Sequence, residues 1–560
     1  MRKLVVLLLL VAASPSLAQY NPYNYTIEKK TSGKAAVVSA HPLASKVGVA
    51  IMKKGGNAFD AAIATQLALA VVFPGAGNIG GGGFMVAVTN KGEQVALDYR
   101  EKAPGSASRD MYLDKDGNAQ TNLSQNGHLA SGVPGTVAGL FSTHAYAKLP
   151  FKQLIQPAID LAEKGFVITE SEANSLNNYA GQFVRYSSRP SAFIKYGGWK
   201  AGDTLVQKEL ANTLKRIRDL GQKGFYEGET ARLIVEEMKR GAGVITLADL
   251  KNYKTAKRVA MVSKYKEYTI VGMPLVSSGG ILIQQMMGMV ENRNIGQYGF
   301  HSWQAVQLMI EAERRAFADR AEFLGDRDFV KVPVKKLTSP EYLRERMSDF
   351  ELGKAGNSKT TNHGNINPES EETTHLSVYD ASGNAVSVTT TLNGGYGSRT
   401  VVGGAGFILN NEMDDFSIKP GVPNMYGALG TEANAIAPNK RMLSSMTPTI
   451  VLKNGKPFLV IGSPGGTTIP TQVYQVLLNT IEFNLSLEDA VWKPRFHHQW
   501  LPDVVYVEKG FPADLKTKLE EMGYKIAERG TIGRFEAIKI VNGVVEAVAD
   551  NRGDDHAEGY

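Results

Sequence analysis

Hydrophobic and polar residues follow different patterns on the two sides of a polar stretch at residues 354–372. Before it, apolar residues recur mostly at helical spacing, with short strands interspersed up to residue 99. After it, alternating patterns predict strands at residues 375–379, 385–392, 406–409, 449–453 and 457–461. Because strands that pair locally lie beside runs of helices, we expect an α+β fold in which helices pack on mainly antiparallel sheets.

One predicted helix is apolar on nearly all sides. Residues 57–72 are rich in Ala and Leu, which predicts a buried helix, and Asn57 is a suitable N-terminal cap. The other helices are expected at residues 150–164, 230–239, within 273–292, at 302–324 and at 471–482.

A glycine-rich segment at residues 75–83 follows the buried helix and precedes a predicted strand at 84–88. It contains the spacing G-x-G-x-x-G, with Asp98 about 20 residues later, as in dinucleotide-binding proteins. That fingerprint requires the order strand, glycines, helix, whereas here the order is helix, glycines, strand. We therefore interpret the glycines as positions where backbones approach closely.

Composition limits the possible functions. The 560 residues are enough for about two to four structural units. With 43% hydrophobic and 21% charged residues, the chain is expected to be globular and soluble. The net charge of +7 is not gathered into a dense basic stripe, so nucleic acid is not an expected partner. The absence of cysteine excludes disulfides, thiolate metal sites and cysteine nucleophiles.

The N-terminus has the features of a secretory signal peptide, residues 1–18. Arg2 and Lys3 precede ten apolar residues, and Ser16-Leu17-Ala18 is a cleavage site of small residues. Ten residues cannot span a bilayer, which requires about 20, and no other segment is long enough. We expect cleavage after Ala18 and a periplasmic or secreted protein without a membrane span.

Common hydrolase and metal motifs are missing. The sequence has no G-x-S-x-G, H-E-x-x-H or P-loop motif. The pair His497-His498 would point in opposite directions in a strand, and the acidic run at 412–415 lacks the calcium-loop pattern. No metal or cofactor is therefore expected, which leaves hydroxyl chemistry.

The junction at Glu372-Thr373 has the anatomy of a self-cleavage site. A threonine hydroxyl is a weak nucleophile unless a base is adjacent, and an N-terminal threonine carries its own base in the α-amine. Such a residue arises when the chain is cut before it, and Thr373 lies where the polar stretch meets a strand. On its own, Thr373 also fits an ordinary strand residue.

Three further features are compatible with that chemistry, although each also has a bland explanation as a turn, a cap or a solvated side chain. The run Ser463-Pro464-Gly465-Gly466 between a strand and a helix can form an oxyanion hole. Arg100 with nearby hydroxyls is able to hold a carboxylate. Acidic and amide side chains could hold an ammonium group, and the candidates are Asn393, Glu412 and Asp415.

Taken together, these residues resemble the γ-glutamyltranspeptidases, which are N-terminal-nucleophile (Ntn) hydrolases. The resemblance covers nearly the whole chain after residue 18. In the second part it rests on segments 373–378, 383–386, 391–393, 409–416, 420–424, 443–446 and 462–466. In the first part it rests on segments 55–58, 77–84, 100–101, 132–136 and 318–320.

The resemblance implies a four-layer αββα sandwich that cuts itself between Glu372 and Thr373. The products would be a large subunit, 19–372, and a small subunit, 373–560, which remain together as a heterodimer. Thr373 would then attack the γ-glutamyl amide of glutathione or a related compound. The γ-glutamyl group would pass to water or to the amine of an amino acid or peptide.

The resemblance also implies roles for individual residues. The N–H groups of Gly465 and Gly466 would stabilise the oxyanion, and Thr391 would orient Thr373. The substrate's α-carboxylate would be held by Arg100, Ser444 and Ser445, and its α-ammonium by Asn393, Glu412 and Asp415. Tyr426 would belong to a lid at 420–431. Two departures from the family pattern are Thr467-Thr468 in place of Ser-Arg and Asn551-Arg552 in place of Pro-Arg.

Two alternatives remain at this point. The first is an acylase of the same fold that acts on glutaryl or cephalosporin side chains. The acidic pair Glu412 and Asp415 argues against it, because a glutaryl group has no ammonium. The second is a periplasmic protein that binds glutathione without chemistry, which predicts an uncut chain.

Overall fold

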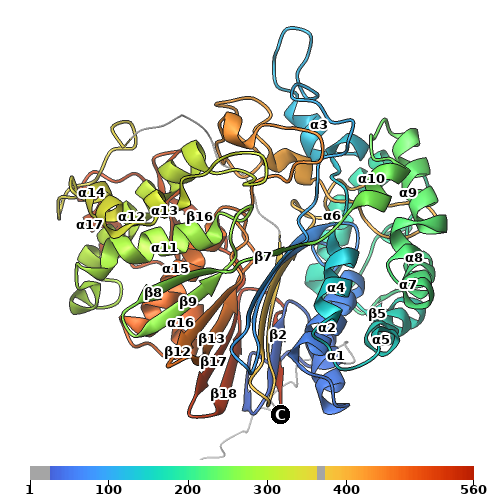
Figure 1. The fold of residues 1–560 in the computed structure, drawn as a ribbon, viewed down its shortest axis with the longest axis horizontal. Coiled ribbons are helices and arrows are strands. Elements are labelled where there is room, and N and C mark those ends of the chain that lie inside the picture. Colours follow the sequence, from blue (N-terminus) through green and yellow to red (C-terminus); the bar gives the residue numbers. More distant parts are fainter. Residues whose placement is uncertain (1–24, 362–372) are drawn as a thin grey trace, which may run out of the picture.

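The structure, a computed structural model, describes residues 25–361 and 373–560. Two seven-stranded sheets face each other in the middle of the molecule, and a layer of helices covers the outer face of each (Figure 1). The expected four-layer αββα sandwich is therefore confirmed. Within each of these sheets, every pair of neighbouring strands is antiparallel.

The first sheet has the strand order β1-β18-β17-β13-β12-β9-β8. Its strands are β1 (Lys30–Gly33), β18 (Val544–Ala549), β17 (Glu536–Val541), β13 (Lys456–Gly462), β12 (Thr449–Lys453), β9 (Tyr268–Gly272) and β8 (Met261–Tyr265). Its outer helices are α11 (Gly279–Glu291), α12 (Trp303–Phe323), α15 (Thr468–Ile481), α16 (Leu487–Trp492) and α17 (Ala513–Glu521) (Figure 1).

The second sheet has the order β19-β2-β10-β11-β3-β4-β7. Its strands are β19 (His556–Gly559), β2 (Ala36–Ser39), β10 (Thr374–Tyr379), β11 (Ala385–Thr391), β3 (Gly82–Val88), β4 (Gln94–Asp98) and β7 (Ala256–Arg258). Its outer helices include α1 (Pro42–Lys53), α2 (Ala58–Val72), α4 (Thr136–His144), α5 (Phe151–Lys164), α7 (Lys208–Leu220) and α9 (Gly228–Arg240) (Figure 1).

Both sheets contain strands from both sides of residue 372. In the second sheet, β10 lies between β2 and β11, and β19 pairs with the other edge of β2. In the first sheet, β12 pairs with β9 on one side and with β13 on the other. The two parts of the chain therefore form one hydrogen-bonded body.

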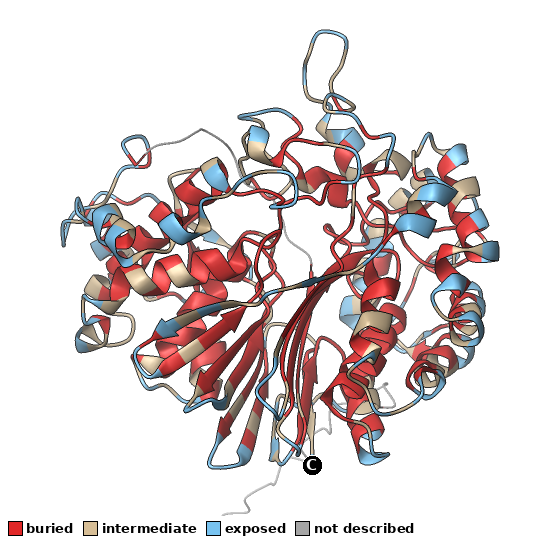
Figure 2. Ribbon diagram, in the orientation of Figure 1, coloured by how far each residue is buried: buried red, intermediate tan, exposed pale blue. Residues whose placement is uncertain are grey.

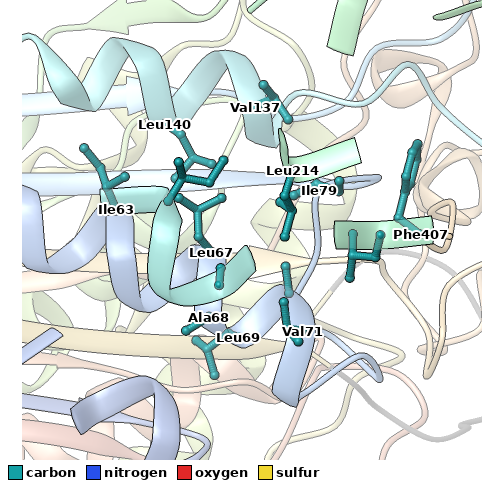
Figure 3. Close-up of a cluster of buried hydrophobic side chains, with 14 of the residues drawn as sticks. Ile63, Leu67, Ala68, Leu69, Val71, Ile79, Val137, Leu140, Leu214 and Phe407 are labelled. Atoms are coloured by element: carbon teal, nitrogen blue, oxygen red, sulfur yellow. The ribbon is translucent and has the colours of Figure 1, made fainter. Parts of the chain in front are cut away.

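Helix α2 is the buried helix that the sequence predicts. All its residues are buried, and Asn57 and Asp60 form a reciprocal capping box at its start. Ile63 and Leu67 of α2 pack with Leu140 of α4 and Leu214 of α7 on the outer face of the second sheet (Figure 3). Burial is deepest in the sheets and in the inward faces of the helices (Figure 2).

One predicted strand and the predicted start of one helix are wrong. Residues 406–409 form only an isolated bridge between Val401 and Ile408, because Gly404 and Gly406 adopt left-handed backbone angles that end a strand. Helix α15 begins at Thr468, three residues before the predicted start, because Pro470 is accommodated in the first helical turn, where its missing N–H is not needed. Across the two described ranges, no helix has both the length and the apolar character needed to cross a membrane.

Candidate active site

Thr373 lies directly before β10, and the sheet register places it opposite Thr391. Thr374 pairs with Thr390 in the antiparallel ladder, so the next position brings residue 373 to residue 391. Residues directly opposite in such a ladder have Cβ atoms about 4.5–5.5 Å apart. Thr373 is 7% exposed, and alternation along the strand points it toward the space between the two sheets.

A buried polar cluster extends from Thr373 between the sheets. His375 bonds through Nδ1 to Oγ1 of Thr389 at 2.9 Å and through Nε2 to Oγ of Ser377 at 3.1 Å. Ser387 Oγ donates to the carbonyl of Ile461 in β13 at 3.1 Å. Burial lowers the pKa of His375 to about 3, so the imidazole is neutral at physiological pH. The cluster joins β10 and β11 to the strand of the opposite sheet that leads into the glycine loop.

Gly462, the last residue of β13, is packed directly against His375. A Cβ atom at position 462 would lie 2.3 Å from Cε1 of the imidazole, closer than side chains can approach. We expect Gly462→Ala to reduce the free energy of unfolding by about 1–3 kcal/mol, because overpacking a well-filled interior has that cost. Denaturant unfolding measures the change.

The matched control for this variant is Gly272→Ala in the same sheet. A Cβ at position 272 would be 3.4 Å from its nearest neighbour, the Cα of Gly280, which is an ordinary contact. Equal stability of the two variants would contradict the role of His375 as a fixed spacer between the sheets.

The glycine loop connects β13 to the N-terminus of α15. Gly465 and Gly466 have φ values of 137° and 52°, and Thr468 Oγ1 donates to the carbonyl of Gly465 at 2.8 Å. Among the described residues, no hydrogen-bond acceptor is found for the backbone N–H of either glycine. Two available N–H groups at a helix N-terminus form a favourable site for an oxyanion.

A narrow cavity of about 20 Å³ brings most of the predicted site residues together. It is lined by Arg100, Arg320, Thr373, Thr391, Asn393, Asp415, Asn424, Tyr426, Ser444, Ser445, Met446, Gly466, Thr467 and Ile469. Two predicted residues are adjacent to this set. Glu412 lies behind Arg100, and Gly465 lines a second cavity of about 460 Å³ that Thr373 also borders.

Arg100 is held by carboxylates rather than solvated. It is 1% exposed, its Nη1 lies 2.5 Å from Oε2 of Glu412, and its Nη2 donates to Oδ2 of Asp415. Glu101 is 3.7 Å from the same guanidinium. The explanation of Arg100 as a solvated strand-end charge is therefore wrong.

The pKa values in this cluster reflect three carboxyl groups around one guanidinium. Burial raises the pKa of Glu101 to about 8, and it raises those of Glu412 and Asp415 above their ordinary range, in each case against the attraction of Arg100. Burial also opposes the charge of Arg100, but Glu412 and Asp415 hold its pKa above the ordinary value. A cation bound at this end of the cavity would favour the ionised forms of these carboxyl groups, so the cluster is suited to accept an ammonium.

The predicted lid residues close over the cavity. Tyr426 donates its hydroxyl to the carbonyl of Asn393 at 2.5 Å, and a Cβ at Gly466 would lie 2.6 Å from the Tyr426 ring. Asn424 Nδ2 donates to Oδ1 of Asp415 at 2.8 Å. The lid therefore contacts both the acidic group and the glycine loop.

The hydroxyl pair Ser444 and Ser445 lies beside the N-terminus of α11. Ser278 donates both its N–H and its Oγ–H to the carbonyl of Ser444, each at 2.8 Å. Ser445 Oγ accepts a hydrogen bond of 3.0 Å from Nη2 of Arg320. Arg320 belongs to a motif that the family resemblance includes, but the sequence analysis assigns it no role in the site.

The two departures from the family pattern have different surroundings. Thr467 lines the cavity and donates Oγ1–H to Oε1 of Gln499 at 2.6 Å, whereas Thr468 stabilises the glycine loop. Arg552 is half-buried among Glu508 and Asp550, away from the narrow cavity.

Some predictions concern residues that the structure does not describe. Glu372, on the N-terminal side of the predicted cut, and the signal segment 1–18 lie outside the described residues. Within the described ranges, no group of three or more His, Cys, Asp or Glu side chains could hold a metal ion.

Comparisons with known proteins agree on one family. The model of the family described as Gamma-glutamyltranspeptidase matches residues 44–560. The glutathione hydrolase proenzyme of Escherichia coli is 45% identical over 550 residues, 96% of this chain and 95% of that protein. The glutathione hydrolase proenzyme of Pseudomonas aeruginosa is 45% identical over 526 residues, 92% and 93% of the two chains. The crystal structure of a cephalosporin acylase from Bacillus halodurans is similar at a TM-score of 0.84 with 27% identity, covering 98% of this chain and all of that chain.

Proposed function

The chain belongs to the gamma-glutamyltranspeptidase family, and on that premise we propose that it is an exported enzyme acting on glutathione and related γ-glutamyl amides. It is an Ntn-hydrolase-type γ-glutamyltransferase. The observation that carries the proposal is the narrow cavity, which combines a nucleophile position, a glycine loop and groups of both charges. Water and the amines of amino acids or dipeptides are the proposed acceptors.

Maturation is the first reaction of Thr373 in this proposal. Its Oγ attacks the carbonyl carbon of Glu372, the peptide C–N bond breaks, and an ester forms while the Thr373 amine is released. Water then hydrolyses the ester to give a large subunit, 19–372, and a small subunit, 373–560. The presence of hydrogen-bonded strands from both parts within both sheets supports a stable heterodimer.

Turnover uses the amine released by maturation. The amine takes the proton from Thr373 Oγ, the oxygen attacks the γ-carbonyl, and the N–H groups of Gly465 and Gly466 stabilise the oxyanion. The proton passes to the leaving amine, and a γ-glutamyl ester of Thr373 remains. Water or an acceptor amine then attacks this ester and regenerates the hydroxyl. Thr391, opposite Thr373 in the sheet register, orients the nucleophile.

Recognition of the γ-glutamyl group relies on its two α-substituents. The α-carboxylate is assigned to Arg100, Ser444 and Ser445, and the α-ammonium to Asn393, Glu412 and Asp415. Arg100 is already paired with Glu412 and Asp415. A bound zwitterion would replace these ion pairs by pairs with its own carboxylate and ammonium, so no buried charge would be left without a partner. Tyr426 and the lid segment close the pocket.

Export is proposed from the sequence of residues 1–18, with cleavage after Ala18. N-terminal sequencing of the large subunit recovered from the periplasm or the medium should begin at Gln19. A large subunit that begins at Met1 and remains in the cytoplasm would contradict this part of the proposal.

The second candidate function is a glutaryl or cephalosporin acylase, which the similarity to the Bacillus halodurans structure favours. We expect kcat/KM to be about 100-fold higher for γ-glutamyl p-nitroanilide than for glutaryl p-nitroanilide, because a hydrogen bond to a buried charged group is worth about 1.5–3 kcal/mol. The reason is the acidic group of Glu412 and Asp415, which a glutaryl substrate leaves without an ammonium partner. Initial rates of p-nitroaniline release measure the ratio.

The two substrates also distinguish the remaining alternatives. Equal rates or a preference for the glutaryl compound would favour the acylase. A purified protein that binds glutathione, releases no product and runs as one uncut band would be the non-catalytic binding protein.

A further inference from the structure

Arg320 is a buried cation in the candidate site that has no carboxylate partner among the residues the structure describes. It lies on α12, is 7% exposed and lines the narrow cavity. Among the described residues, its only hydrogen-bond partners are two hydroxyls: Nε donates to Oγ of Ser278 at 3.2 Å and Nη2 to Oγ of Ser445 at 3.0 Å. No described Asp or Glu oxygen lies within 4.0 Å of its guanidinium.

The other buried arginines near it have carboxylate partners. Arg314 and Arg315, earlier on the same helix, both pair with Glu311. Arg100, on the same cavity, contacts Glu412 and Asp415. A buried charge without a counter-charge is costly, so an uncompensated guanidinium that lines a cavity favours the binding of an anion.

The electrostatics of Arg320 agree with this description. Burial lowers its pKa, Asp415 acts in the opposite direction and Arg100 adds to the lowering, which together bring the pKa to about 10. It therefore remains protonated at neutral pH. Its Nη1 makes no hydrogen bond to a described residue, so the guanidinium keeps donors for a ligand.

The position of Arg320 links it to the hydroxyl pair of the site. Ser445 accepts its hydrogen bond, and Ser278, its other partner, donates to the carbonyl of Ser444. On the acidic side of the cavity, three carboxyl groups surround Arg100. The cavity thus has an anion-binding side at Arg320 and Ser445 and a cation-binding side at Glu412 and Asp415.

We propose that Arg320 is a further substrate-binding residue, which supplies the unpaired positive charge for the α-carboxylate of the γ-glutamyl group. The inference rests on the proposed function, because it assumes a γ-glutamyl substrate in this cavity. Arg320 and Ser445 bind the α-carboxylate from one side. Arg100 stays between that carboxylate and its own acidic partners, Glu412 and Asp415. The substrate carboxylate and the Arg320 guanidinium then compensate each other's charge.

The test uses the mature enzyme and two p-nitroanilides that differ in one group. The γ-glutamyl compound carries both the carboxylate and the ammonium, and the 4-aminobutyryl compound keeps the ammonium but lacks the carboxylate. For Arg320→Met, kcat/KM on the γ-glutamyl compound should fall about 100-fold, since truncating one partner of a buried charge pair has a large effect on binding. The loss should appear in KM, because the carboxylate is remote from the reacting carbonyl.

The 4-aminobutyryl compound separates ligand binding from a structural role. Its rate, read in single turnover with excess enzyme, should change less than about threefold in Arg320→Met, because this substrate has no carboxylate to lose a partner. Equal losses on both compounds would show that Arg320 only positions Ser445 and α12, and no loss on either would show that it binds nothing. Either result overturns the inference.

Two further variants complete the design. Arg320→Lys keeps the charge and should show the same selectivity with a smaller loss, so it replaces Arg320→Met if that variant fails to fold. Arg327→Met removes an exposed charge just beyond the same helix and should leave both rates unchanged. Self-cleavage and thermal midpoints report folding. If the wild-type protein itself releases nothing from γ-glutamyl p-nitroanilide, the proposed function fails, which is distinct from the failure of the Arg320 assignment.

Discussion

Replacing Thr373 by alanine should leave the chain in one piece and without γ-glutamyl transfer or hydrolysis. The substitution removes the Oγ atom that both reactions require, and it leaves β10 and its register in place. Denaturing electrophoresis should show one band of the full mature length, and p-nitroaniline release should fall to background. Loss of an obligatory nucleophile commonly costs about 10⁶-fold in kcat.

Two neighbouring substitutions serve as controls for Thr373→Ala. Thr374→Val removes a buried hydroxyl that has no hydrogen-bond partner among the described residues and should leave both cleavage and activity intact. Thr373→Ser keeps a hydroxyl and should still cleave, at a lower rate. If Thr373→Ala still separates into two subunits, the assignment of the nucleophile is wrong.

Gly466→Ala should reduce kcat by about 10²–10³-fold, the usual effect of losing one oxyanion donor. Its φ of 52° lies in the left-handed region, and a Cβ at this position would be 2.6 Å from the ring of Tyr426. The loop must move, and the N–H of residue 466 then no longer points at the reacting carbonyl. Single-turnover acylation with γ-glutamyl p-nitroanilide measures the effect directly.

Two further variants distinguish backbone strain from the steric clash with Tyr426 as the cause of the Gly466→Ala defect. Gly455→Ala, in the turn between β12 and β13, introduces the same left-handed strain at φ 74° in open space and should have little effect on acylation. Combining Gly466→Ala with Tyr426→Ala removes the clashing ring and should restore part of the rate. A double variant no faster than Gly466→Ala would rule out the clash as the cause.

The sequence predicts well the elements whose signal is local. Helix α2 is apolar on all sides and carries its own capping box, and β10 and β11 follow a hairpin pattern, so all three were expected nearly at their observed bounds. Residues 406–409 look like a strand, but the left-handed glycines Gly404 and Gly406 precede and begin the segment and leave only an isolated bridge. The start of α15 was misplaced because a proline is permitted in a first helical turn as well as before a helix.

Which residues meet in the site is decided by the tertiary structure and cannot be predicted from local sequence patterns. Thr373 and Thr391 meet through sheet register, whereas Arg100 reaches the cavity from beyond the end of β4 in the same sheet and Ser445 from the segment before β12 in the opposite sheet. The family resemblance listed these residues together, and the structure places them around one cavity. Their individual roles in catalysis stay predictions.

Arg320 was missed for a physical reason. It lies near the end of the long amphipathic helix α12. A single arginine at such a position is usually interpreted as a solvated side chain. Burial distinguishes Arg320 from a solvated arginine, and the absence of a nearby carboxylate among the described residues distinguishes it from Arg314 and Arg315.

The central claim is that Thr373 becomes the N-terminus of a separate subunit and acts there as nucleophile and base. N-terminal sequencing of the smaller band from an active preparation tests it most directly. The predicted result is a sequence beginning Thr-Thr-His-Leu, from residue 373. An active preparation that contains only one uncut chain, or a smaller subunit that begins at another residue, would contradict it.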